Sequence, residues 1–141
     1  MDQVRVGFIG AGGIASRHVG DLLQFEDVKI MAVADPAQDR AQVQAQRCGA
    51  QVYGDYRAML DKTPVDALYI CVPPFAHGEL ELAALERRLP FFVEKPLATN
   101  WETAARIAQG VTEQNLITAV GYHWRYLDTT EEAQTPMVND R

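Results

Sequence analysis

The sequence contains no dense cluster of basic residues, no long apolar run and no more than two cysteines. Its formal net charge is −6, and residues 128–141 carry four carboxylates against one arginine. An acidic chain without a basic patch is not expected to bind nucleic acid or an anionic membrane. The apolar runs are far shorter than the roughly 20 residues that span a bilayer. The chain also does not open with a basic segment followed by an apolar one, so no membrane partner is expected.

The cysteines and histidines are few and scattered. Cys48 and Cys71 are fewer than a secreted disulfide scaffold uses, which favours free thiols in a reducing compartment and a cytoplasmic protein. His18, His77 and His123 lack metal-ligand spacing, so no metal site is predicted. We interpret His18 as a residue on the surface of a helix.

Short apolar segments alternate with segments of helical period along the 141 residues. This alternation predicts a single α/β domain, a Rossmann fold with a doubly wound, mostly parallel sheet covered on both faces. Residues 1–127 are expected to form the domain, and residues 128–141 an acidic tail that begins a connection to an absent second domain. Strands are expected at 4–10, 28–34, 51–54, 65–72, 90–93 and 116–120, and helices at 13–24, 36–48, 56–60, 76–88 and 101–111.

A glycine fingerprint, Gly10-Ala-Gly12-Gly13-Ile14-Ala15, follows the first apolar segment. In such a turn the first glycine permits a sharp bend and the second lets backbone approach a pyrophosphate, while Ala15 allows close helix packing. The following helix N-terminus attracts phosphate. Glycine also occurs in purely structural turns. The preceding strand, the following helix and an acid twenty residues further on favour a dinucleotide site.

Asp35 ends the second expected strand, where a carboxylate can accept hydrogen bonds from the adenosine ribose. The same charge repels a 2′-phosphate, and no arginine follows immediately, so we expect NAD, with NADP less favoured. Asp35 can also serve as a helix cap, because Pro36 suits the first position of a helix. Both roles are compatible.

Two further strand ends carry residues of chemical interest. Val72-Pro73-Pro74 predicts a stiff turn that could form a wall of the cofactor site. His77 follows at the expected start of a helix, and it is either a site residue or a solvent-exposed residue. Glu94-Lys95-Pro96 places an ammonium group at the edge where a parallel sheet holds its active site. Beside a cationic nicotinamide ring, Lys95 could exchange the proton of a substrate hydroxyl while hydride moves. Glu94 is expected to hold the lysine.

Aromatic residues alternate with His123 and Arg125 in the segment Gly121-Tyr-His-Trp-Arg-Tyr126. This segment either lines a ligand pocket or packs against something beyond the domain. The residues expected to contact the dinucleotide are therefore Gly10, Gly12, Gly13, Ile14, Ala15, Asp35, Val72, Pro73, Pro74, His77, Glu94, Lys95 and His123.

These motifs together resemble the N-terminal domain of the glucose–fructose oxidoreductase, inositol dehydrogenase and MocA group, Gfo/Idh/MocA. The resemblance rests on the glycine fingerprint, Asp35-Pro36, Pro73-Pro74-Phe-Ala-His77, Glu94-Lys95-Pro96 and residues 121–126. It implies NAD(P)-dependent oxidation or reduction of a sugar or polyol, with Lys95 as the catalytic residue.

Members of this group continue into a second α/β domain that supplies most substrate contacts, further catalytic residues and the oligomer interface. That domain is missing from these 141 residues. Many members also carry Asn where this chain has His123. We therefore expect the cofactor half of a dehydrogenase, inactive alone and homo-oligomeric. The alternatives are a non-catalytic NAD-binding or sensing module and an S-adenosylmethionine-dependent methyltransferase, which Glu94-Lys95-Pro96 disfavours.

Overall fold

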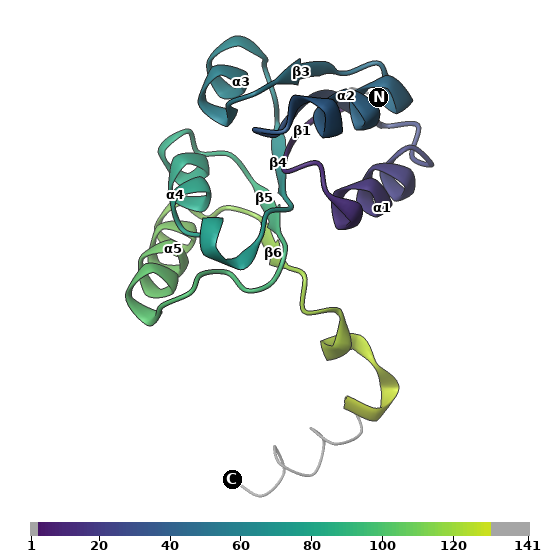
Figure 1. Cartoon of the computed structure of the whole chain (residues 1–141). Helices are drawn as coiled ribbons and strands as arrows, with labels where there is room; N and C mark the ends of the chain where they lie inside the picture. The colour runs from purple at the N-terminus through teal and green to yellow at the C-terminus, as the bar shows by residue number, and fades with distance from the viewer. Residues whose placement is uncertain (1–2, 131–141) are drawn as a thin grey trace, which may run out of the picture.

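A computed structural model describes residues 3–130 and shows one parallel sheet of six strands in the order β3-β2-β1-β4-β5-β6 (Figure 1). This arrangement confirms the expected Rossmann fold. Every strand pair in it is parallel, where the sequence predicted a mostly parallel sheet. The strands are β1 (Val4–Ile9), β2 (Val28–Ala34), β3 (Gln51–Tyr53), β4 (Ala67–Ile70), β5 (Phe91–Val93) and β6 (Thr118–Val120).

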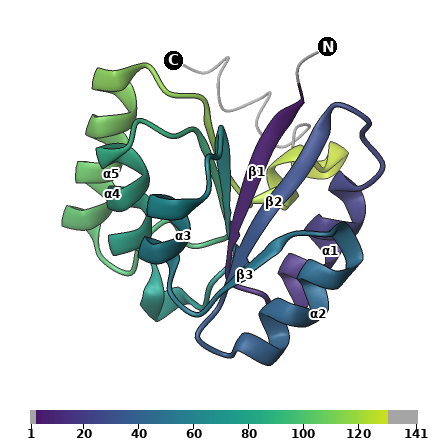
Figure 2. The same cartoon turned by 90° about the horizontal axis from the view of Figure 1, so that it is seen from above.

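Helices cover both faces of the sheet (Figure 2). The α-helices are α1 (Gly13–Leu22), α2 (Gln38–Cys48), α3 (Tyr56–Lys62), α4 (Glu79–Glu86) and α5 (Trp101–Gln114). Helices α1 and α2 lie on one face, and α3, α4 and α5 lie on the other. Two short 3₁₀ segments, η1 (Pro74–Ala76) and η2 (His123–Tyr126), follow β4 and β6.

The two faces form two apolar cores because successive residues of a strand point in opposite directions. Phe8 of β1 is fully buried with Val19 of α1 in one core. Its neighbour Ile9 joins the other, which contains Met59 and Ile107 from α3 and α5. A strand that is buried on both sides is apolar at successive positions, which explains the apolar runs 6–9 of β1 and 30–34 of β2. The charged residues Arg5 and Lys29 lie near the more exposed starts of these strands.

The strand order reverses direction between β1 and β4. The chain moves outward from β1 through β2 to β3, then returns to pair β4 with the other side of β1. Ligands of open parallel sheets bind at the carboxyl ends of the strands where this reversal leaves a crevice. The turns after β1, β2 and β4 meet at that point.

Two predicted helix starts are wrong. Helix α2 begins at Gln38 with Ala37 as its N-cap, so Pro36 lies outside the helix. The Asp35 carboxylate accepts the Ala37 backbone N–H at 2.8 Å, which forms a local turn before the helix can start. Helix α4 begins at Glu79, and His77 therefore ends the η1 turn instead of opening a helix.

The chain after the edge strand β6 leads away from the body of the domain (Figure 1). Tyr122, Trp124 and Tyr126 are 52%, 71% and 72% exposed, and no other element of residues 3–130 covers them. The predicted acidic tail falls largely on residues 131–141, which lie outside the described residues, so this boundary stays a prediction. No helix within the described range is long and apolar enough to cross a bilayer.

Candidate dinucleotide site

The glycine turn lies at the end of β1 and opens into the crevice. Gly10 has φ 93°, and a Cβ at this position would collide with the Cys71 carbonyl, so only glycine fits. Gly12 is the N-cap of α1, where a Cβ would meet no atom within 4 Å. Among the described residues no side chain caps this helix, so its first backbone N–H groups are available to an anion.

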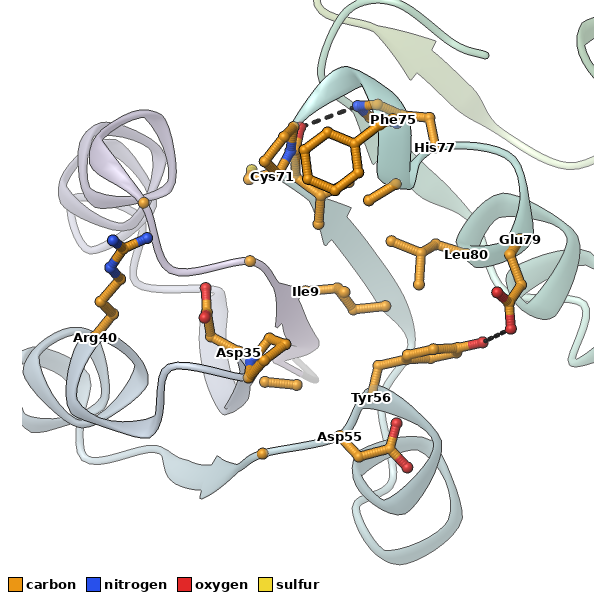
Figure 3. A pocket seen from close by; sticks show the side chains of 18 of the residues that line it. Ile9, Asp35, Arg40, Asp55, Tyr56, Cys71, Phe75, His77, Glu79 and Leu80 are labelled. Atoms are coloured by element: carbon orange, nitrogen blue, oxygen red, sulfur yellow. Dashed lines mark hydrogen bonds between the residues drawn. The ribbon is translucent and has the colours of Figure 1, made fainter. Parts of the chain in front are cut away.

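A cavity of about 690 Å³ adjoins the turn (Figure 3). This volume lies within the range of small-molecule sites. Residues from the ends of β1, β2 and β4, the start of α3 and the start of α4 form its walls. Seven of the predicted site residues line it: Gly10, Gly12, Ile14, Asp35, Val72, Pro73 and His77.

The other predicted site residues are not in the cavity wall. Ala15 is a fully buried residue of α1, where it allows the close packing expected of this position. Gly13 is the first residue of α1, and Pro74 begins η1. The remaining three, Glu94, Lys95 and His123, follow β5 and β6 at the same edge of the sheet.

Asp35 connects the second strand to the glycine turn. One carboxylate oxygen accepts the backbone N–H of Ala11 at 2.8 Å, and the other accepts that of Ala37 at 2.8 Å. A carboxylate has about four acceptor sites, so two of them stay available to ribose hydroxyls. The capping and binding roles considered from the sequence are thus geometrically compatible, although the cap acts on the turn before α2.

Arg40, on the first turn of α2, also lines the cavity, and the sequence analysis missed it. In Figure 3 its guanidinium lies on the same side of the cavity as Asp35. Arg40 is exposed, and within residues 3–130 it makes no ion pair. Three residues separate Arg40 from Pro36, so only the position of α2 brings it to the site.

Tyr56 and Glu79 close the opposite side of the cavity (Figure 3). The Tyr56 hydroxyl donates to Glu79 Oε1 at 3.0 Å, and the Arg57 guanidinium lies 4.6 Å above the Tyr56 ring and pairs with Glu79. Burial, and then the hydrogen bond to Glu79, raise the pKa of Tyr56 to about 12. Tyr56 therefore stays a neutral hydrogen-bond donor that links α3 to α4.

His77 is buried, so of its two expected settings, a site residue or a solvent-exposed one, the solvent-exposed setting is wrong. Its Nδ1 lies 2.8 Å from Glu81 Oε1, and its Nε2 lies 3.1 Å from the Val72 carbonyl oxygen. A carbonyl only accepts, so Nε2 carries a hydrogen and donates to Val72. Glu81 also accepts the Gly78 N–H at 2.5 Å. His77 thus fixes the turn that forms one wall of the cavity.

Cys71 directly follows β4 beneath the glycine turn and lines the cavity. Burial raises the pKa of its thiol to about 12, with a smaller contribution from the charge of Glu94. Both cysteines are free, as the sequence predicted. Cys71 is therefore an apolar wall residue at neutral pH and not a nucleophile.

Lys95 is the second residue after the carboxyl end of β5 and is exposed. The expectation that Glu94 holds the lysine side chain is wrong. Glu94 Oε1 lies 2.8 Å from His18 Nε2, and Glu94 Oε2 accepts the backbone N–H of Lys95 at 3.3 Å. Within residues 3–130 the Lys95 ammonium has no ion pair.

His18 and His123 also differ from their expected settings. The side chain of His18 is 20% exposed and contacts Glu94, so it is not a surface residue. His123 lies in η2, outside the cavity, with its ring 6.1 Å from that of Trp124. No residue of 121–126 lines the cavity, and the exposed aromatic side chains favour the other interpretation, that this segment packs against something beyond the domain. No metal-binding cluster of three or more His, Cys, Asp or Glu occurs in the described part of the chain.

Comparison with known proteins decides the family. Residues 4–122 match the model of the GFO_IDH_MocA oxidoreductase family with an NAD-binding Rossmann fold. The chain belongs to this family. The match extends over nearly the whole described range and disfavours the methyltransferase hypothesis.

Individual relatives extend beyond this chain. A myo-inositol 2-dehydrogenase from Thermotoga maritima is 27% identical over 124 residues, which are 87% of this chain and 37% of that protein. The WlbA dehydrogenase from Chromobacterium violaceum, solved with NADH and UDP-GlcNAcA, superposes with a TM-score of 0.87 at 23% identity, covering 100% of this chain and 41% of that one.

A third relative binds the phosphorylated cofactor. The 3-ketoreductase KijD10 from Actinomadura kijaniata, a variant solved with TDP-benzene and NADP, has a TM-score of 0.83 at 26% identity, over 98% of this chain and 44% of that chain. The chain therefore spans less than half the length of the relatives that it matches, and these include a protein solved with NADH and one solved with NADP.

Proposed function

We propose that this chain is the dinucleotide-binding part of an oxidoreductase that moves hydride between NAD(H) and a sugar or polyol hydroxyl or its ketone. One observation carries the proposal. Asp35 hydrogen-bonds to the glycine turn and lines the same cavity as Gly12, beside an uncapped helix N-terminus. The myo-inositol dehydrogenase among the relatives supports a polyol substrate.

The residues present fit a dinucleotide. Open space above Gly12 and the N–H groups of α1 suit a pyrophosphate, and the free acceptor sites of Asp35 suit the adenosine ribose. Val72 and Pro73 offer an apolar wall, which His77 holds in place. When bound, the nicotinamide would supply the hydride donor or acceptor.

Lys95 is proposed as the general acid–base residue. It lies at the carboxyl edge of the sheet, and no carboxylate of the described residues neutralises it. Its amine would take the proton of a substrate hydroxyl during oxidation and return it during reduction. Such a role requires a substrate held against Lys95, and the cavity wall described above contains no residue on that side of the crevice.

NAD(H) is proposed over NADP(H) because the Asp35 charge would oppose a 2′-phosphate. Arg40 would favour NADP(H) instead, because a guanidinium attracts a 2′-phosphate. This guanidinium lines the same cavity and has no ion-pair partner within residues 3–130. Asp35 dominates because it is fixed by two backbone hydrogen bonds, whereas Arg40 extends from an exposed helix surface. The two free cysteines support a reducing, cytoplasmic compartment.

The 141 residues alone are proposed to bind dinucleotide, to self-associate and to lack turnover. Tyr122, Trp124 and Tyr126 form an exposed apolar surface after β6, of the kind that finds a partner. Without a second wall, Lys95 gains little from proximity to a substrate. Calorimetry with NADH, sedimentation and a hydride-transfer assay with polyols test these statements. Robust turnover, or a strictly monomeric species at high concentration, would contradict the corresponding statement.

The second candidate is a non-catalytic NAD-binding or sensing module that acts through a partner. The same exposed surface favours it, because it offers a docking face after β6. The two functions are separated by a fusion protein in which residues 1–127 of this chain are followed by the second domain of the Thermotoga relative. Restored turnover that depends on Lys95 supports the oxidoreductase, and NAD-dependent capture without turnover supports the module.

A further inference from the structure

His18 and Glu94 connect the helix behind the glycine turn to the strand that carries Lys95. His18 lies in the second turn of α1, and Glu94 directly follows β5. The side chains are 20% and 12% exposed, and His18 Nε2 lies 2.8 Å from Glu94 Oε1. A carboxylate only accepts hydrogen bonds, so Nε2 carries the hydrogen and donates it.

An aromatic layer fixes the His18 ring in this orientation. The ring centroid lies 4.9 Å from that of Phe92, in an edge-to-face arrangement, and 5.6 Å from that of Tyr69. Tyr69 in turn stacks between Phe92 and Phe8 on the same sheet face. These contacts restrict the rotamers of His18, so the ring is held with Nε2 directed at Glu94.

Glu94 is held on its other sides as well. Its second oxygen accepts the backbone N–H of Lys95 at 3.3 Å. The chain after β6 passes so close that a Cβ on Gly121 would lie 3.1 Å from that same oxygen. The carboxylate therefore cannot turn toward the Lys95 ammonium without leaving His18.

We propose that His18 and Glu94 are positioning residues for Lys95. The pair fixes the backbone from which Lys95 projects relative to α1, the helix whose N-terminus would receive the pyrophosphate. It also keeps the Glu94 carboxylate away from the Lys95 ammonium, which stays available to a ligand. This inference rests on the role of Lys95 in the proposed function.

The three lysines of the chain provide a direct test, because Lys29 and Lys62 are internal references. The lysines are reductively methylated with ¹³C, which keeps their charge, and their NMR signals are followed as NAD⁺ is added. In the parent protein the Lys95 signal is expected to shift, while those of Lys29 and Lys62 stay in place. If no Lys95 shift occurs while NAD⁺ binds, the proposed role of Lys95 fails before the pair is tested.

His18→Phe keeps an aromatic ring against Phe92 and removes the donor to Glu94. We expect the NAD⁺-induced shift of Lys95 to fall by at least about half, with dinucleotide affinity changed less than about threefold. His18→Gln restores a donor and part of the shift, and Arg17→Ala, on the exposed side of α1, leaves it unchanged. Glu94→Ala breaks the same link from the other end and decides the question if His18→Phe does not fold. A parent-like Lys95 shift in either folded link-breaking variant would overturn the proposal.

Discussion

The Asp35 carboxylate accepts the Ala11 backbone N–H at 2.8 Å, so the end of β2 is fixed to the turn that follows β1. This contact joins the two parts of the sequence that were predicted to hold a dinucleotide, 24 positions apart. It also sets the distance between an open helix N-terminus and a carboxylate, the two groups that a pyrophosphate and a ribose require.

The first prediction concerns cofactor preference. NADH should bind roughly 100-fold more tightly than NADPH, because a 2′-phosphate against Asp35 meets several kcal/mol of like-charge repulsion. Asp35→Ser should narrow the difference between the affinities for NADH and NADPH. Adding Arg40→Ala to Asp35→Ser should weaken NADPH binding again. Asp39→Ser, on the exposed part of α2, is the matched control. Calorimetry that finds NADPH bound equally well by the parent protein would refute the proposed preference.

The second prediction concerns Lys95. When the residues after position 127 are supplied by the Thermotoga relative, Lys95→Ala should lower turnover by about 10²–10⁴-fold, the usual contribution of a general acid–base group. NADH affinity should stay within about threefold. Lys62→Ala, at the end of α3, is the matched control. Parent-like turnover of Lys95→Ala would make Lys95 a structural residue.

The sequence revealed most of the fold because the determinants of the fold are local. Glycines near positions 10–13 and apolar strands could be found without knowing what lies beside them. His18 and Glu94 are 76 residues apart, and their contact depends on how α1 crosses β5. Arg40 reaches the cavity only because of where α2 lies. In the sequence Arg40 is one of several polar residues on the surface of this helix, and nothing in the pattern indicates which of them faces the site.

The third prediction concerns acid stability. Hydrogen bonds from the Arg5 side chain and backbone lower the pKa of Asp66 to about 2, from a usual value near 4. A lowered pKa in the folded state stabilises the protein above the unfolded pKa, and this contribution disappears as pH falls through about 4 to 2. Asp66→Asn should make the free energy of unfolding depend less on pH between about 4 and 2, whereas Asp21→Asn should leave this pH dependence unchanged. The effect should be small because the pair is exposed.

The fourth prediction concerns thiol reactivity. The raised pKa of Cys71, about 12, leaves little thiolate at pH 8, whereas Cys48 is less buried. Iodoacetamide should label Cys48 at least about tenfold faster than Cys71, as measured by peptide mass spectrometry. Raising the pH should increase Cys71 labelling until unfolding intervenes. Faster labelling of Cys71 would mean that the thiol is not enclosed as described.

The central claim is that a pyrophosphate lies over Gly12, and the Gly12→Ala variant tests it most directly. A Cβ there meets no atom within 4 Å, so the free energy of unfolding should change by no more than about 1 kcal/mol, the usual effect at a helix N-cap. Gly10→Ala, by contrast, should be strongly destabilised by its collision with the Cys71 carbonyl. The decisive measurement is calorimetric titration of folded Gly12→Ala with NADH. We expect affinity to fall by at least about 100-fold, and parent-like affinity would contradict the account.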